Sequence, residues 1–392
     1  MKPLLLLLLA LPLGAQDALV ESGYVHFYNL EYDEALADFE QAAREHPDVP
    51  DLHNHVAEAL VFREMYRDGA LESELVSGNN SFLRRPKLNP PPEVRQQFLG
   101  ELQKAMSLAQ ARIDRNPRDA RALYAMGISY GLRANYFFLV EKAWKKSLND
   151  ATSARKLHNR VSEVEPANVD ARLVQGLHDF LIGSLPLGWR MLGFLIGFHG
   201  DKAKGIRTIL DVAAHGTSNR VEAEIFLCAL YRRERKPREA IPLLEDLLRR
   251  FPRNYLLRFE QAEMYGALGD KRQALGAVET ITELKKRNAP GYARVPWEKI
   301  YYEMGNIEFW YNDLVQALAH LRKVTSSEQE LDLNTGALAW LRTGQTYDLT
   351  RQRSLALDAY KKAIAYAPQA DAARESRRYL SAPYRRETGP RP

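Results

Sequence analysis

The sequence predicts an all-α fold: a right-handed superhelical solenoid of about eight helix–turn–helix pairs, with insertions in the central repeats. Three observations support this prediction. Small, aromatic and helix-ending residues recur with a period of about 34 residues. The small residues fall where two packed helices have to approach closely. The 392 residues are 45% hydrophobic and 27% charged, enough to build a core and too polar for an integral membrane protein.

The period is clearest near the C-terminus. Its members there are Trp340, Gly344, Tyr347, Ala356, Tyr360, Ala363 and Pro368. This spacing resembles the tetratricopeptide repeat, whose unit is a pair of helices. The spacing predicts that Gly344 and Ala356 leave room for the two helices to touch and that Pro368 ends the second helix. One such pair cannot bury its apolar face alone, so neighbouring pairs are expected.

Neighbouring pairs follow the same register. Their marker residues are Tyr231, Ala240, Leu244 and Pro252; Ala262, Tyr265, Gly269 and Ala274; and Gly305, Ala317, Leu321 and Val324. A further copy, formed by Gly23, Ala35, Phe39, Ala42 and Pro47, stands near the N-terminus, so the first helix is predicted to begin close to Asp17. Since the copies follow one another, we expect residues 16–380 to form one continuous solenoid.

The N-terminus has the pattern of an export signal. Lys2 precedes an apolar run over residues 4–11, and small residues follow up to Ala15. This run is too short to span a bilayer and is typical of a cleaved signal peptide. We expect residues 1–15 to be removed and the mature chain to reside in the periplasm or cell envelope. The alternative is that this run is the apolar start of the first helix.

Two insertions interrupt the register in the first half of the chain. The first, near residues 67–92, is rich in Gly, Asn, Ser and Pro, which favour loops, and is either a contact arm or a solvated linker. The second, near 132–149, combines aromatic residues with lysines around Trp144. It is either an elongated helix whose aromatic face packs on the next pair or a segment suited to a membrane surface.

The third insertion, near 180–200, is the most apolar. Residues 180–198 read FLIGSLPLGWRMLGFLIGF, in which Arg190 is the only charge. The length fits a transmembrane helix, but Pro186 and four glycines weaken a continuous helix. Burial in the solenoid is one interpretation. The other is contact with a membrane or an apolar partner, and the contact residues would then be Trp189, Phe194, Leu195 and Phe198.

The end of this insertion carries a narrower resemblance. Residues 197–202 and then Gly205 and Ile206 resemble a stretch in the tetratricopeptide-repeat thirty-nine and inclusion-body clearance family, which also follows an apolar segment with a Leu-Pro. The resemblance implies a similar helical architecture and a non-enzymatic role. That family is intracellular and is linked to lipid droplets and protein aggregates, whereas the N-terminus here predicts export.

No pattern in the sequence predicts catalysis, a cofactor or a metal. None of the nine histidines forms an H-E-x-x-H pair, and the single cysteine, Cys228, excludes a Cys/His zinc site built from paired cysteines and an intramolecular disulfide. Asp201, in a Gly-Asp-Lys sequence, is best interpreted as a helix N-cap. The formal net charge is +5, without a long basic run among aromatics, so nucleic acid is not the expected partner.

The expected function is that of a scaffold or adaptor that binds a protein or peptide. In this repeat class the first helix of each pair lines the inner groove, where aromatic and arginine side chains make effective contacts. The residues predicted there, about half of them exposed, are Tyr24, Phe27, Tyr28, Asn54, Glu58, Tyr124, Arg232, Arg233, Tyr302, Asn306, Phe309, Trp310, Gln345 and Asp348. The alternative is a membrane-associated or lipid-handling adaptor that uses residues 180–198. The basic tail, residues 381–392, is predicted to be disordered. The sequence does not indicate an oligomeric state.

Overall fold

A computed structural model describes residues 14–69, 71, 88–185, 199–328 and 333–386. Within these ranges the secondary structure is helical, with no strand. The helices are α1 (Gly14–Tyr28), α2 (Tyr32–Glu45), α3 (Pro50–Arg67), α5 (Pro92–Arg115), α6 (Ala120–Leu139), α7 (Trp144–Val164), α8 (Arg172–Gly183), α10 (Lys202–His215), α11 (Arg220–Arg233), α12 (Pro237–Arg250), α13 (Tyr255–Leu268), α14 (Lys271–Lys286), α15 (Trp297–Trp310), α16 (Leu314–Thr325), α17 (Leu333–Leu349), α18 (Arg353–Tyr366) and α19 (Asp371–Ser381).

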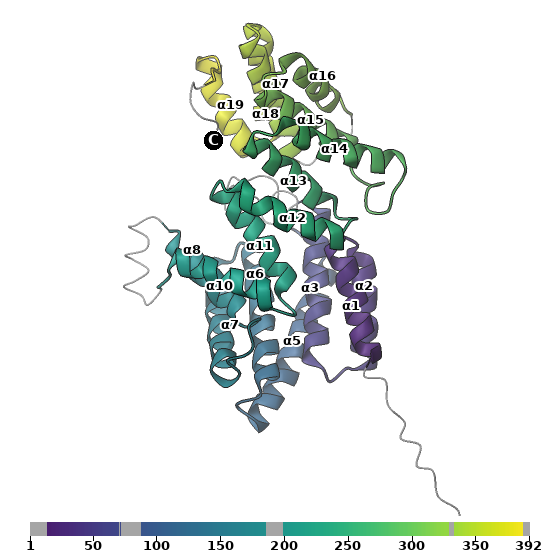
Figure 1. The fold of residues 1–392 in the computed structure, drawn as a ribbon, viewed down its shortest axis with the longest axis vertical. Helices are drawn as coiled ribbons and strands as arrows, with labels where there is room; N and C mark the ends of the chain where they lie inside the picture. Colours follow the sequence, from purple (N-terminus) through teal and green to yellow (C-terminus); the bar gives the residue numbers. More distant parts are fainter. Residues whose placement is uncertain (1–13, 70, 72–87, 186–198, 329–332, 387–392) are drawn as a thin grey trace, which may run out of the picture.

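The helices form consecutive antiparallel pairs that stack along the chain, and α19 follows the last pair (Figure 1). The first helices of the pairs are α1, α3, α6, α8, α11, α13, α15 and α17. Each first helix packs on the second helix of its own pair, and each second helix packs on the next first helix. The predicted all-α solenoid is therefore confirmed, with about eight pairs as the period indicated.

Glycines on the first helices stand where the second helix of the same pair comes close. A Cβ atom added to Gly127 in α6 would lie 2.8 Å from Nε2 of His158 in α7. The same construction at Gly344 in α17 meets the ring of Tyr360 in α18. Since both partner side chains are fully buried, they have no room to move aside. This close approach explains why the period shows small residues at these positions.

The solenoid does not stay an open array, because the turn between α12 and α13 packs on the N-terminal pair. Arg253 donates from Nε and Nη2 to the two carboxylate oxygens of Glu31, at 2.6 and 2.8 Å. These residues are 222 positions apart in the sequence. The backbone N–H of Arg253 also donates to Asn29, and the rings of Tyr28 and Phe251 lie 4.9 Å apart. In Figure 1 this contact lies where α12 and α13 meet the purple N-terminal helices.

The ion pair at this contact also lowers the pKa of Glu31. Burial alone would raise the pKa of its carboxyl group. The hydrogen bonds from Arg253 and His26 outweigh burial and hold this pKa below its ordinary value. The carboxylate is therefore charged at neutral pH, and the contact between the N-terminal pair and the turn between α12 and α13 includes an ion pair.

The three insertions differ in how far the structure describes them. The helix α3 ends at Arg67 and α5 begins at Pro92, which agrees with the first insertion, although residues 72–87 lie outside the described residues. The second insertion is not one elongated helix, since α6 ends at Leu139 and α7 begins at Trp144. The third is described only up to residue 185 and again from 199.

The aromatic residues of the second insertion pack on a different neighbour from the expected one. Tyr136, at the end of α6, is buried and stacks on Phe98 of the preceding pair, with ring centroids 4.5 Å apart. Phe138 packs edge-on against Trp144, which is itself 47% exposed. The interpretation as a packed helical segment therefore fits the ring of Tyr136. This ring packs on the preceding helix pair, however, and not on the next one as expected.

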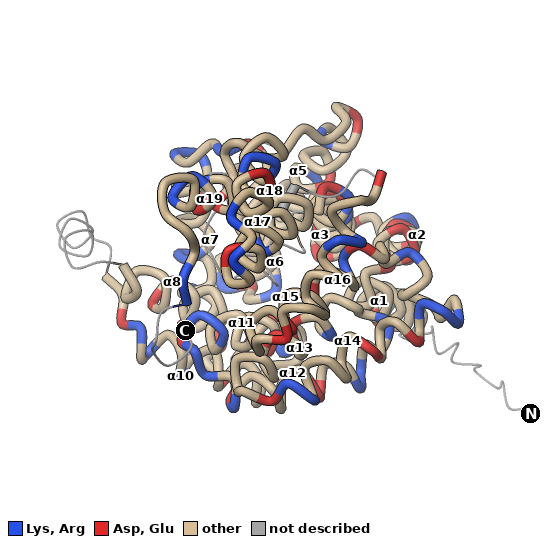
Figure 2. The backbone as a smooth tube through the Cα atoms, turned by 90° about the horizontal axis from the view of Figure 1, so that it is seen from above, with Lys and Arg blue, Asp and Glu red and all other residues tan. Residues whose placement is uncertain are grey.

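Charged residues of both signs are interspersed along the backbone (Figure 2). Ion pairs join neighbouring helices at many points, for example Arg133 with Asp150 at 2.7 Å between α6 and α7. In the part of the chain that the structure describes, no helix has the length and apolar character required to cross a bilayer. The first helix begins at Gly14, slightly before the predicted start at Asp17.

Candidate functional site on the first helices

The first helices of neighbouring pairs form a common face of the solenoid. Directly contacting pairs include α3 with α6, α13 with α15, and α15 with α17. Side chains also connect first helices that are distant in the sequence: Tyr28 of α1 donates a hydrogen bond to Glu222 of α11. We call this surface the first-helix face. Two groups of polar and aromatic residues lie on it.

The first group joins α1, α3, α6 and α11. The hydroxyl of Tyr24 lies 2.7 Å from Nδ1 of His55 and donates to Glu58 at 3.2 Å. Tyr28 donates to one carboxylate oxygen of Glu222, and the other oxygen is buried without a partner among the described residues. Tyr124, on α6, is the sixth member of the group. We call these residues the tyrosine–carboxylate cluster: Tyr24, Tyr28, His55, Glu58, Tyr124 and Glu222.

The cluster has strongly shifted pKa values because its groups are enclosed by protein. Burial, reinforced by the nearby Glu222 carboxylate, raises the pKa of Glu58 to about 8. Burial is also the main cause that raises the pKa of Glu222 to about 7. The pKa of His55 falls to about 4 because burial disfavours its charged form. At neutral pH the cluster is thus a set of mainly neutral hydrogen-bonding groups.

Between this cluster and the C-terminal pairs, Arg232 of α11 forms a buried ion pair. Its Nη1 lies 2.6 Å from Glu260 and 3.7 Å from Glu263, both on α13. The neighbouring Arg233 is exposed and lies over the ring of Phe180, 5.8 Å from its centroid. Arg232 therefore joins two first helices, whereas Arg233 is accessible from solvent.

The second group surrounds the C-terminal segment of the chain, residues 382–386. Beyond α19 the backbone N–H of Tyr384 donates to Oδ2 of Asp348, at 2.7 Å. The guanidinium of Arg386 donates to the backbone carbonyls of Phe309 and Trp310, the last two residues of α15. The same guanidinium lies 5.0 Å from the centroid of the Phe309 ring. Residues 384–386 are therefore held on the first-helix face.

The aromatic part of this second group is fixed by another arginine. Arg342 of α17 lies over the rings of Phe309 and Trp310, with its guanidinium carbon 5.0 and 4.7 Å from the two centroids. Its Nε donates to Asn306 at 2.9 Å, and its Nη1 donates to Gln345 at 2.6 Å. These contacts of Arg342 do not involve the C-terminal segment. We call Phe309, Trp310, Arg342, Asp348 and Tyr379 the tail site.

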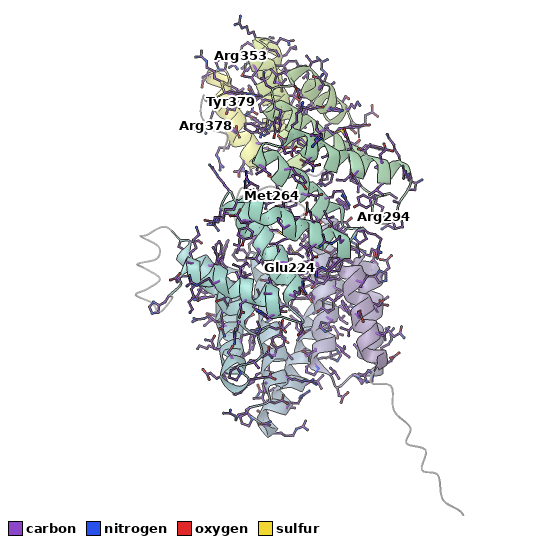
Figure 3. All side chains as sticks on the ribbon, viewed as in Figure 1. Glu224, Met264, Arg294, Arg353, Arg378 and Tyr379 are labelled. Carbon is purple, nitrogen blue, oxygen red and sulfur yellow. The ribbon has the colours of Figure 1, made fainter. Side chains whose placement is uncertain are left out.

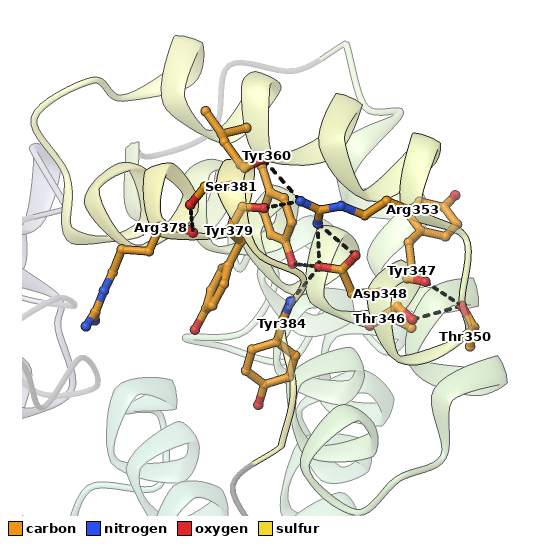
Figure 4. Close-up of polar contacts among 11 residues, drawn as sticks. Thr346, Tyr347, Asp348, Thr350, Arg353, Tyr360, Arg378, Tyr379, Ser381 and Tyr384 are labelled. Carbon is orange, nitrogen blue, oxygen red and sulfur yellow. Dashed lines mark hydrogen bonds and ion pairs between the residues drawn. The ribbon is translucent and has the colours of Figure 1, made fainter.

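Asp348 connects the tail site to the last three helices (Figure 4). Its carboxylate accepts hydrogen bonds from Arg353 at 3.0 Å and from the hydroxyl of Tyr360 at 2.8 Å. Burial, reinforced by this carboxylate, raises the pKa of Tyr360. Arg353 also donates to the carbonyl of Tyr379, near the end of α19, and Figure 3 shows the two residues together at the C-terminal end of the molecule.

The predicted contact residues are less exposed than expected. The expectation that about half would be exposed is not met, because only Arg233 is exposed. The buried residues are Phe27, Tyr28, Asn54, Tyr302, Phe309 and Gln345. The partly exposed residues are Tyr24, Glu58, Tyr124, Arg232, Asn306, Trp310 and Asp348, although the side chain of Asp348 is itself only 1% exposed. Burial follows from packing between adjacent first helices: Asn54 of α3 donates to the carbonyl of Ala125 in α6, and Tyr302 of α15 lies in one apolar cluster with Ala339 of α17.

The structure nevertheless brings most of the predicted residues into the two groups. Tyr24, Tyr28, Glu58 and Tyr124 meet in the tyrosine–carboxylate cluster, and Asn306, Phe309, Trp310, Gln345 and Asp348 meet at or beside the tail site. Sequence reasoning missed His55, Glu222, Arg342 and the C-terminal segment itself. His55 stands one residue from the predicted Asn54, but no repeat position marks Glu222 or the tail.

The predicted disorder of residues 381–392 is wrong for its first part. Ser381 ends α19, and residues 382–386 have defined contacts, because Asp348 and the end of α15 satisfy their hydrogen bonds. Residues 387–392 lie outside the described residues, as do Trp189, Phe194, Leu195 and Phe198 of the apolar segment. No group of three or more His, Cys, Asp or Glu side chains suited to a metal ion occurs in the described ranges.

Comparison with known proteins agrees with this architecture. A family model described as tetratricopeptide repeat matches residues 20–63 and 229–293. The APC/C hetero-tetramer Cut9-Hcn1 shares 15% sequence identity, with 93% of this chain and 55% of that chain covered and a TM-score of 0.50. Yeast Tom70 shares 13% identity, with 94% and 95% covered and a TM-score of 0.42. A tetratricopeptide repeat protein from Parabacteroides merdae shares 14% identity, with 83% and 98% covered and a TM-score of 0.32.

At these identities the structural likeness establishes the fold alone, and no match was found among curated proteins. The stacked pairs, with small residues at each helix contact, define a helical repeat protein. Residues 20–63 and 229–293 match the tetratricopeptide repeat family. Proteins built from this repeat are generally non-catalytic scaffolds, and the fold suggests protein interaction. The narrower resemblance around Gly205 stays a prediction.

Proposed function

We propose that the protein is an exported scaffold that binds a protein or peptide partner on its first-helix face. The observation that carries this proposal is the position of residues 384–386. Asp348 receives the backbone N–H of Tyr384, and the carbonyls of Phe309 and Trp310 receive Arg386. This face thus has the groups needed to hold an extended segment of polypeptide.

The tyrosine–carboxylate cluster supports the same proposal in the N-terminal half. Tyrosine side chains offer a large contact area and a hydroxyl group with little loss of conformational freedom. In Tyr24 and Tyr124 such side chains are only partly exposed, together with the carboxyl group of Glu58. A partner that lies along the first helices passes from this cluster over Arg233 toward the tail site.

Site-specific photo-crosslinking in the producing cell tests which face is used. A benzophenone amino acid is placed at Arg233, which is exposed on a first helix and lies away from the tail contacts. The matched controls are Val315 on α16 and Leu355 on α18, which are 79% and 46% exposed and belong to second helices. We expect a defined crosslinked protein from position 233 and none from the controls. Crosslinks from 315 and 355 alone would place binding on the opposite face.

Export is tested separately. The apolar run over residues 4–11 and the small residues up to Ala15 support cleavage by a signal peptidase. We expect the protein in the periplasmic or envelope fraction, with Gln16 as its N-terminal residue by protein sequencing. Recovery of an uncleaved chain with Met1 in the cytoplasmic fraction would overturn this part of the proposal and leave the binding surface untouched.

A further inference from the structure

The tail site is built so that it persists without the segment that occupies it. Asp348 is held by Arg353 and Tyr360, and its side chain is 1% exposed. The rings of Phe309 and Trp310 are covered by Arg342. Each of these contacts lies within α15, α17 and α18, so the receiving groups stay in place when the C-terminal segment leaves.

We propose that the tail site binds an extended peptide in which an aromatic residue is followed two positions later by an arginine, and that Tyr384 and Arg386 are an intramolecular occupant that such a peptide displaces. This inference rests on the proposed function, because it names the class of partner for the same face. It also makes the end of the chain a regulator of that face.

The requirement for arginine follows from the end of α15. The last carbonyl groups of a helix carry the negative end of its dipole and can accept hydrogen bonds from outside the helix. The carbonyl of Phe309 already accepts the backbone N–H of Asn312, at 3.0 Å, and has a second lone pair for another donor. Arg386 donates to two of these carbonyls, at Phe309 and Trp310, and places its planar group 5.0 Å from the centroid of the Phe309 ring. A lysine has a single ammonium group and lacks the planar fork that serves two carbonyls and a ring together.

The requirement for an aromatic residue follows from the rings around Tyr384. Its ring lies 5.3 Å from that of Tyr379, at an interplanar angle of 80°, and 6.0 Å from that of Phe309. Such edge-on and tilted contacts are favourable for aromatic pairs. In an extended chain, residues two positions apart lie on the same side, and Arg385 between them is exposed. The spacing of Tyr384 and Arg386 therefore matches one face of an extended peptide.

Displacement is expected because a longer partner can add contacts along the first-helix face to those that the tethered occupant makes. A short flexible tether gives an effective concentration of about 1 mM. If a free peptide of the same sequence has a dissociation constant of about 0.1 mM for the empty site, the tether weakens its apparent binding about tenfold. A partner that makes further contacts along the first-helix face binds tightly enough to overcome this tenfold weakening.

A peptide-binding experiment on the full-length chain tests the proposal. The probe is a fluorescein-labelled peptide with the sequence of residues 380–386, measured by fluorescence anisotropy. We expect it to bind the Tyr384→Ala/Arg386→Ala variant at least about tenfold more tightly than the unsubstituted chain, because the site is then empty. Arg385→Ala is the matched control and should bind the probe as the unsubstituted chain does. A probe with alanine in place of its tyrosine and its last arginine should not bind.

Several outcomes would overturn the proposal. Equal binding to both proteins would mean that the tail does not compete, and no binding to the double variant would mean that the site does not accept this class of peptide. Unfolding of the double variant at a clearly lower temperature would make the tail a structural element rather than a displaceable one. Crosslinking from Arg233 is independent of these measurements, so failure here leaves the proposed scaffold function standing.

Discussion

The carboxylate of Asp348 accepts the backbone N–H of Tyr384 at 2.7 Å, and this contact fixes the path of the chain after its last helix. The same carboxylate accepts hydrogen bonds from Arg353 and Tyr360 and is almost completely buried. A buried charge is tolerated when several donors satisfy it. One aspartate therefore joins α17, α18 and the C-terminal segment.

Replacement of this aspartate should loosen the whole C-terminal end. In Asp348→Asn the side chain keeps its size, but Arg353 loses its charged partner and one of the hydrogen bonds from Arg353, Tyr360 and Tyr384 is lost or reversed. We expect a loss of about 2 kcal/mol in the local stability of α18 and α19, because leaving one partner of a buried pair without its counterpart is unfavourable. Hydrogen exchange at the amides of α19 and of Tyr384 measures this loss.

The control for this change lies on the next helix. Asp358 of α18 is 60% exposed and pairs with Lys362 one turn away. Asp358→Asn should change the stability by less than about 0.5 kcal/mol, since exposed ion pairs contribute little. Equal protection of α19 in both variants would contradict the structural role assigned to Asp348.

A second prediction concerns the contact between the N-terminal helix pair and the turn that connects α12 to α13. Arg253 and Glu31 form two hydrogen bonds across 222 residues of sequence. A double-mutant cycle with Arg253→Ala and Glu31→Ala should give a coupling free energy of about 1 to 2 kcal/mol, measured by chemical unfolding. Arg249→Ala is the control, because Arg249 is 69% exposed and pairs only within its own helix. A coupling near zero would mean that the N-terminal pair is held by packing alone.

These two contacts also show where sequence reasoning reached its limit. The helix pairs could be predicted because residues such as Gly344, Ala356 and Tyr360 have counterparts at similar offsets in other repeats, and Gly344 meets the ring of Tyr360 within its own pair. The contact of Arg253 with Glu31 has no such signature, since it joins two single positions far apart. The period places residues on a helix face, but it does not say how strongly the array bends.

The same limit applies to the candidate site. The structure brings the predicted first-helix residues Asn306, Trp310 and Asp348 to or beside the tail site. Exposure was overestimated because adjacent first helices pack on one another, as Tyr302 does. The tail was predicted to be disordered because it is rich in proline and arginine, and composition does not reveal that Asp348 and the end of α15 complement it.

A third prediction concerns pH. The pKa of Glu58 is raised to about 8 in the folded protein, mainly by burial, against an ordinary value near 4.5. The unfolded chain therefore releases this proton at lower pH than the folded chain does. The stabilising contribution of the protonated group is complete below about pH 4.5 and is lost as the pH rises through about 8. Glu222, with a pKa raised to about 7, acts in the same direction.

Glu58→Gln tests this dependence, because glutamine resembles the protonated carboxyl group. We expect the variant to be more stable than the unsubstituted protein at pH 8 by at least about 1 kcal/mol, and to depend less on pH between 5 and 8. The expected gain in stability is smaller than the pKa shift alone would give, because Glu58 is partly exposed and solvent screens its charge. Thermal unfolding followed at pH 5 and pH 8 measures it, with Glu283→Gln, whose side chain is exposed and pairs with Lys286 one turn away, as the control. Equal pH profiles for the two variants would contradict the prediction.

The last prediction uses two glycines one turn apart on the same helix. A Cβ atom at Gly127 of α6 would lie 2.8 Å from Nε2 of His158, whose ring is fully buried, whereas a Cβ atom at Gly131 meets nothing within 4 Å. We expect Gly127→Ala to destabilise the protein by about 1 to 3 kcal/mol, because α6 and α7 have to move apart. Gly131→Ala should instead stabilise it by about 0.5 to 1 kcal/mol, since alanine favours a helix over glycine. Chemical unfolding of the two variants gives both values. Changes of the same sign would show that helix propensity, rather than the contact of first and second helices, decides which residue stands at position 127.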